Sequence, residues 1–112
     1  MKPKSVHYHD GKVGSIRWHR KPMAYGKEVD GYSTITDRRI VVRSNAPHSK
    51  QAYIIFHELL HQSLSPIVLD SPVRQGDVEE ILVQTVATNM ALIWKRNPSL
   101  FTWIHLGLTS ED

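Results

Sequence analysis

The residues best suited to chemistry in this sequence are two histidines and a glutamate in the segment His57-Glu58-Leu59-Leu60-His61. The segment continues the apolar run Tyr53-Ile54-Ile55-Phe56, which favours a helix. On a helix, residues four apart share one face and lie about 6 Å apart along the axis. Two imidazoles at this spacing can hold one Zn²⁺, and the glutamate can act on the water that zinc activates. The pattern therefore predicts a zinc-dependent hydrolase, most often a peptidase, with His57 and His61 as metal ligands and Glu58 as the catalytic residue.

A catalytic zinc generally needs a third protein ligand. The chain contains no cysteine, so this ligand must be a histidine or a carboxylate. Residues 62–68 contain no histidine, which excludes the HExxHxxGxxH pattern of the metzincins. Glu79 and Glu80, at the start of a second expected helix, are the best candidates, and the phase of that helix does not separate them. Asp70 and Asp77 are weaker candidates, because they lie in the preceding loop or at its end.

The sequence around the motif predicts the elements that must position these residues. Apolar periodicity and stop signals predict three helices, over residues 49–64, 78–96 and 99–105. Asp77 is the expected N-cap of the second helix. Runs rich in β-branched residues predict three strands, over residues 13–19, 32–36 and 40–43. The last two form a hairpin around a turn at Asp37-Arg38, and the first joins them in a small antiparallel meander, so the expected fold class is α+β.

Length and composition limit the class of protein to which this sequence can belong. With 112 residues, 40% hydrophobic and 22% charged, the chain is expected to form one globular domain over residues 1–112, with 1–12 and 109–112 at its periphery. No apolar segment follows the basic residues at the start, and no stretch approaches the roughly 20 apolar residues that span a bilayer. We therefore expect no secretory signal, no membrane partner and, with no cysteines, a cytoplasmic location.

Charge and metal chemistry leave other functions open. The formal net charge is +3, and most of the 14 lysines and arginines precede the motif, which could mark a nucleic-acid surface. Solvated strand faces and turns are the favoured interpretation of this charge. The expected partner is therefore a protein or peptide substrate. The alternatives are a zinc amidase or deacylase, and a binding module whose metal is structural or whose ligand is nucleic acid.

Hydrolysis at this motif requires a proton carrier and a donor for the developing oxyanion. Glu58 is expected to take the proton from the activated water and deliver it to the leaving amine. The oxyanion usually needs a further hydrogen-bond donor. The sequence does not rank the four candidates Tyr25, Tyr32, His48 and His105. An extended substrate is expected to pair with an exposed strand edge, within residues 32–36 or 40–43.

Several short motifs follow one another in a familiar order: Tyr25-Gly26, Ile40-Val41-Val42, Ile54 to His61, Glu79-Glu80 and Val83 with Val86-Ala87. This order resembles the small zincin-like metallopeptidases of phages and bacteria, in the neighbourhood of the ImmA/IrrE peptidases. The resemblance covers about residues 13–96. It implies a minimal zincin-like fold with a small sheet, an active-site helix and a second helix that bears a glutamate. It also implies that Glu80, three residues before Val83, is the third zinc ligand, as in gluzincins.

Overall fold

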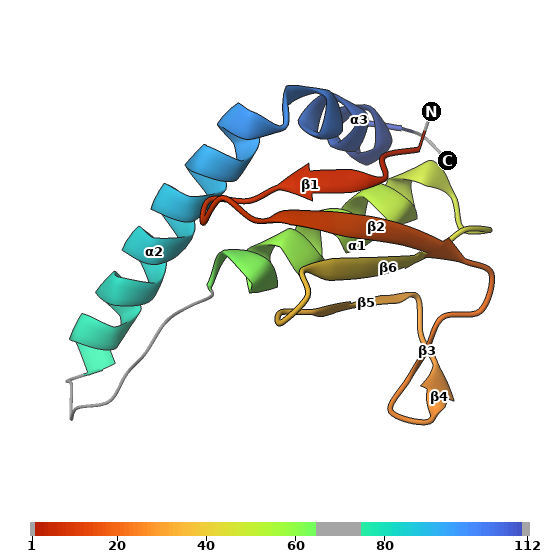
Figure 1. The fold of residues 1–112 in the computed structure, drawn as a ribbon, viewed down its shortest axis with the longest axis horizontal. Coiled ribbons are helices and arrows are strands. Elements are labelled where there is room, and N and C mark those ends of the chain that lie inside the picture. Colours follow the sequence, from red (N-terminus) through yellow and green to blue (C-terminus); the bar gives the residue numbers. More distant parts are fainter. Residues whose placement is uncertain (1, 65–74, 111–112) are drawn as a thin grey trace.

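The structure is a computed structural model that describes residues 2–64 and 75–110. Its strands are β1 (Ser5–His7), β2 (Val13–His19), β3 (Met23–Ala24), β4 (Lys27–Glu28), β5 (Gly31–Thr34) and β6 (Arg39–Arg43). Its helices are α1 (His48–Ser63), α2 (Gln75–Arg96) and α3 (Pro98–Leu108). Four strands form one sheet in the order β1-β2-β6-β5, and β3 and β4 form a separate hairpin that extends beyond it (Figure 1). The expected α+β class is confirmed.

The main sheet is mixed, so the expected antiparallel meander is wrong. The hairpin of β5 and β6 is antiparallel as expected, with residues 35–38 in the turn between them. β6, however, pairs with β2 in parallel, and Ile16 lies opposite Ile40. The chain passes through the β3–β4 hairpin and β5 before it returns beside β2, and this longer path lets β6 run in the same direction as β2.

The core lies between the sheet and the helices. One face of the sheet directs alternate side chains towards α1, as the two-residue period of a strand requires. The core residues from the strands and helices are Val6, Tyr8, Ile16, Ile40, Val42, Ala52, Ile54, Ile55, Leu59, Ile93, Leu100, Phe101 and Ile104. Val6 and Tyr8 are fully buried. The segment 1–12, expected at the periphery, therefore contributes to the core.

The helices agree with the sequence to within a few residues. α1 begins and ends one residue earlier than expected, and α3 is longer at both ends. α2 begins at Gln75, so Asp77 lies inside the helix and is not its N-cap. α3 packs closely on α1, because a Cβ on Gly107 would lie only 2.5 Å from that of Ala52.

α2 joins the rest of the molecule mainly through its second half. Asn89 Nδ2 donates a hydrogen bond to the Ser63 carbonyl at 2.8 Å, and Ile93 is fully buried. The first half of α2 projects away from the sheet (Figure 1). Across the described ranges, no helix has the length and apolar character needed to cross a membrane.

Candidate metal and catalytic site

His57 and His61 lie together on the open side of α1. Their ring centroids are 4.9 Å apart, and the two rings meet edge to face at 72°. The His57 side chain is 49% exposed, and His61 is also exposed. Tyr53, one turn earlier, lies beside His57 with a centroid separation of 6.0 Å. The helical spacing predicted from sequence thus brings two imidazoles side by side, where both can reach one metal ion from solvent.

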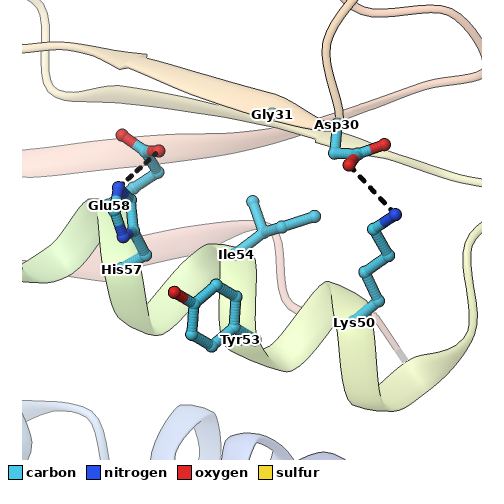
Figure 2. Close-up of a pocket in the computed structure, with 7 residues that line it drawn as sticks. All are labelled: Asp30, Gly31, Lys50, Tyr53, Ile54, His57 and Glu58. Atoms are coloured by element: carbon cyan, nitrogen blue, oxygen red, sulfur yellow. Dashed lines mark ion pairs between the residues drawn. The ribbon is translucent and has the colours of Figure 1, made fainter.

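Glu58 points the other way, towards the sheet. A step of one residue turns the helix by about 100°, which moves Glu58 from the open side of α1 to its packed side. The residue is buried, and its Oε1 accepts a 2.7 Å hydrogen bond from Ser33 Oγ on β5. Its Oε2 lies 4.0 Å from His57 Nε2 (Figure 2). One oxygen of the carboxylate is therefore fixed by the sheet, and the other faces the histidine side.

Ser33 is a site residue that sequence reasoning missed. It pairs with Ile40 in the β5–β6 register, and Ile40 is a core residue on the face covered by α1. Gly31, two residues earlier, lies on the same face, where an added Cβ would stand 2.5 Å from Ile54 Cγ2. The missing side chain lets β5 approach α1 closely enough for Ser33 to reach Glu58. The only sequence signal is a small polar residue at an inward strand position, visible once the register is known.

A second set of contacts fixes the end of α1 that carries His61. The buried guanidinium of Arg38 donates to the Gln62 carbonyl at 2.8 Å and to Gln62 Oε1 at 2.9 Å. Gln62 Nε2 in turn donates to the Thr34 carbonyl at 3.1 Å, at the end of β5. Arg38 also forms a 2.6 Å ion pair with Asp10. These bonds tie the last turn of α1 to β5, so they position His61 relative to Glu58.

Glu80, the expected third metal ligand, is not brought to the histidines. It is exposed, and its Oε1 accepts a 2.9 Å hydrogen bond from Gln84 Nε2. α2 approaches the site at Val86, which lines an apolar hollow of about 340 Å³ with His57 and His61. Glu80 lies six residues before Val86, about 9 Å along the helix axis. Within residues 2–64 and 75–110, leaving aside Asp77 and Glu79, whose side chains the structure does not describe, no three His, Asp or Glu side chains form a metal-binding group.

The other carboxylates considered as the third metal ligand have side chains outside the part of the chain that the structure describes. Asp70 lies in the segment 65–74, and the side chains of Asp77 and Glu79 are likewise outside the described part of the chain. The structure therefore brings together His57, Glu58 and His61.

Two hollows flank Glu58 along the edge of β5. The first, about 230 Å³ and drawn in Figure 2, is lined by Asp30, Gly31, Lys50, Tyr53, Ile54, His57 and Glu58. The second, about 290 Å³, is lined by Tyr25, Gly31, Tyr32, Ser33, Ile35, Glu58 and His61. Both hollows share Gly31 and Glu58. The first also includes Lys50 and Tyr53 and so lies towards the start of α1, whereas the second includes His61 and lies towards its end.

The two hollows differ in charge. The first carries an ion pair between Lys50 Nζ and Asp30 at 3.0 Å. The hydrogen bond and charge of Lys50, together with Arg43, hold the pKa of Asp30 below its ordinary value, so this carboxylate stays ionised well into acid. The described residues that line the second hollow include no lysine or arginine; Tyr25, Tyr32 and Ile35 form its apolar part, and Glu58 and His61 are its titratable groups.

The structure also sorts the four candidate oxyanion donors. Tyr25 and Tyr32 line the second hollow beside Glu58. His48 instead packs on Trp103, with ring centroids 4.3 Å apart and Nε2 3.1 Å from the Trp103 carbonyl oxygen. His105 lines a different hollow, with residues of α2 and α3. Tyr25 and Tyr32 are therefore the two candidates that share a hollow with Glu58.

Comparison of this chain with protein-family models, with curated proteins and with solved structures finds no match. What the site can do therefore follows from the residues that form it.

Proposed function

We propose that this protein is a zinc-dependent metallopeptidase of minimal zincin type, akin to the ImmA/IrrE peptidases. One observation carries the proposal: His57 and His61 lie side by side and open to solvent, while Glu58 between them is buried and held by Ser33. A helix with two incidental histidines would not need a buried carboxylate beside them, because such a group is costly to remove from water.

The residues present fit a zinc ion in part. Two neutral imidazoles on one helix face are common zinc ligands, and their exposure leaves room for substrate. Glu80 would supply the third ligand only if the first half of α2 lay closer to His57 and His61 than it does in this structure. When bound, zinc supplies a Lewis acid that activates water and polarises the scissile carbonyl.

The chain's own groups then move the protons. Glu58 accepts a proton from water and delivers it to the leaving amine. The hydrogen bond from Ser33 occupies Oε1, so Oε2, on the His57 side, is the oxygen available for this transfer. Tyr25 or Tyr32 would donate to the developing oxyanion from the second hollow.

The substrate would lie extended along β5. Of the two segments considered for this role, β6 pairs on both sides, with β2 and with β5, and has no free edge. β5 is the last strand of the sheet and borders both hollows that flank Glu58. A peptide added at this edge would pass directly over Glu58.

The test combines metal analysis with peptide cleavage. The purified protein should contain one zinc and cleave unstructured peptides in a chelator-sensitive manner. Glu58→Gln should retain zinc and the fold but lose at least about 100-fold in rate, because it removes the proton carrier. His57→Ala should lose zinc, whereas His19→Ala, which alters an exposed histidine on β2, should keep both zinc and activity.

Two results would contradict this function. Full activity in Glu58→Gln would mean that another group carries the proton. A zinc-loaded protein that leaves every peptide intact but hydrolyses acylated amines would be an amidase or a deacylase.

A further inference from the structure

The tip of the β3–β4 hairpin carries an unusual residue for its backbone. Met23 pairs with Glu28 and Ala24 with Lys27, which leaves Tyr25-Gly26 as a two-residue turn. Both turn residues have positive φ, 54° for Tyr25 and 76° for Gly26. Turns of this kind favour Asn-Gly, because a bulky side chain is strained in the left-handed region. Tyrosine therefore occupies a position where the fold alone would favour another residue.

The Tyr25 side chain gains no packing that would offset this strain. It is 98% exposed. Among the described residues, no hydrogen bond or ring contact of its side chain is present. Backbone strain that local contacts do not offset is a feature of binding and catalytic sites.

The base of the hairpin, in contrast, is firmly held. Arg43, at the end of β6, donates to the Arg20 and Val29 carbonyls, both at 3.1 Å, and to Asp30 at 3.2 Å. The Val29 amide also donates to the carbonyl of the buried Pro22 at 2.9 Å. These contacts fix the hairpin on the sheet, so its exposed tip has a defined place.

That place is the wall of the second hollow beside Glu58. Among the described residues, Tyr25 shares this wall with Tyr32 and Ile35 and with no lysine or arginine, and Glu58 and His61 line the hollow beside them. An aromatic or large aliphatic group would bury its surface against these side chains. An acidic side chain presents less apolar surface to these groups, and burying its carboxylate there would cost hydration.

We infer that the β3–β4 hairpin is a substrate-binding arm and that Tyr25 contacts a large apolar side chain adjacent to the bond cleaved. The inference rests on the proposed function, because it takes the substrate to be a peptide extended along β5. It adds a substrate class: peptides with an aromatic or large aliphatic residue on the side of the scissile bond that faces the second hollow. Tyr25 is then a specificity-determining residue.

The first experiment follows the cleavage position. Short alanine- and serine-rich peptides carry a single phenylalanine that is moved through the central positions, and products of the zinc-loaded protein are mapped by mass spectrometry. The cleaved bond should move with the phenylalanine at constant spacing. The kcat/KM should exceed that of a matched aspartate peptide by roughly 10-fold or more.

Variants of the hairpin test the role of Tyr25 itself. Tyr25→Ala should markedly lower the phenylalanine-to-aspartate ratio, with Tyr32 and Ile35 still lining the hollow, and Tyr25→Phe should keep the ratio, because the ring makes the contact. Met23→Ala is the matched control, since Met23 is an exposed apolar residue of the same hairpin that does not line the hollow. Circular dichroism and thermal melting check that each variant is folded.

A binding measurement separates this inference from the proposed function. Fluorescence anisotropy with labelled phenylalanine and alanine peptides and the Glu58→Gln protein should show a preference for phenylalanine that Tyr25→Ala markedly lowers. If that preference is present but the wild type cleaves no peptide, the peptidase proposal fails and the binding arm stands. If the wild type cleaves peptides but shows no such preference, the arm is overturned. If Tyr25→Phe and Tyr25→Ala lost the preference for phenylalanine equally, the arm would also be overturned, because that result would assign the preference to the hydroxyl group.

Discussion

Arg38 and Tyr25 have nearly the same positive φ angle in very different surroundings. Both are non-glycine residues in turns between strands, with φ of 52° and 54°. Arg38 is 3% exposed, and its guanidinium lies over the Tyr8 ring and bonds Asp10 and Gln62. Tyr25 is 98% exposed and makes no such contacts among the described residues.

The contrast teaches how to interpret strain in this molecule. At Arg38, the cost of the left-handed conformation is offset by buried hydrogen bonds that join three segments of the chain. At Tyr25, no contact among the described residues offsets a similar cost of about 1–2 kcal/mol. The first position therefore serves stability, and the second is a place to look for function. Replacing each residue with glycine, which relieves the strain at both, should have opposite effects.

Arg38→Gly should have the largest effect. Glycine removes the backbone strain but leaves the Gln62 amide and the Asp10 carboxylate without their buried partner, so we expect a net loss of about 2–3 kcal/mol in the free energy of unfolding. Chemical denaturation measures it. Arg39→Ala is the control, because Arg39 pairs with Asp37 at the surface and should change stability by less than about 1 kcal/mol. An Arg38→Gly protein as stable as the wild type would break the comparison.

Lowering the pH should weaken the same Arg38 network, with a smaller effect on the free energy of unfolding. Partial burial alone would raise the pKa of Asp10, but the hydrogen bond and charge of Arg38, with the Lys12 amide, outweigh it and hold that pKa below its ordinary value. A lowered pKa stabilises the fold above the unfolded value, near 3.9, and this stability is lost as pH falls through the folded pKa. Asp10→Asn should cost about 1 kcal/mol at neutral pH and make the decline in acid shallower. Urea unfolding at several pH values tests this, and an unchanged decline would remove Asp10 from the network.

Tyr25→Gly should have the smallest effect, and of opposite sign. It relieves the left-handed strain, although the more flexible glycine also stabilises the unfolded chain, so we expect a gain of up to about 1 kcal/mol. The variant should also show a markedly lower preference for phenylalanine peptides. Thermal melting and the peptide assay give the two readouts. A marked loss of stability would mean that the tyrosine supports the fold.

The helix α1 and the β5–β6 hairpin were predictable because local patterns determine them. The apolar periodicity around His57 and His61 placed α1 within one residue, and the β-branched runs around residues 35–38 identified the hairpin. The motif also predicted which three side chains would lie together, since that depends only on helical geometry. Their assignment to zinc and catalysis stays a prediction.

Features that depend on contacts between distant segments were not predictable in the same way. Nothing in the sequence of β2 specifies parallel pairing with β6, and the role of Ser33 depends on a register that places it opposite Ile40. The turn at Tyr25-Gly26 has only a weak local signal, because glycine favours turns but tyrosine does not. The position of Glu80 depends on how α2 packs, which helical phase does not determine.

The hydrogen bonds of Arg43 determine which part of the β3–β4 hairpin can accept a different sequence. They lie at the base of the hairpin, at the Arg20 and Val29 carbonyls and at Asp30, not at the tip. New sequences can therefore replace the tip between Ala24 and Lys27 without disturbing the core or α1, whereas the buried Pro22 has to be kept. The tip of the hairpin is therefore a suitable site for a designed library.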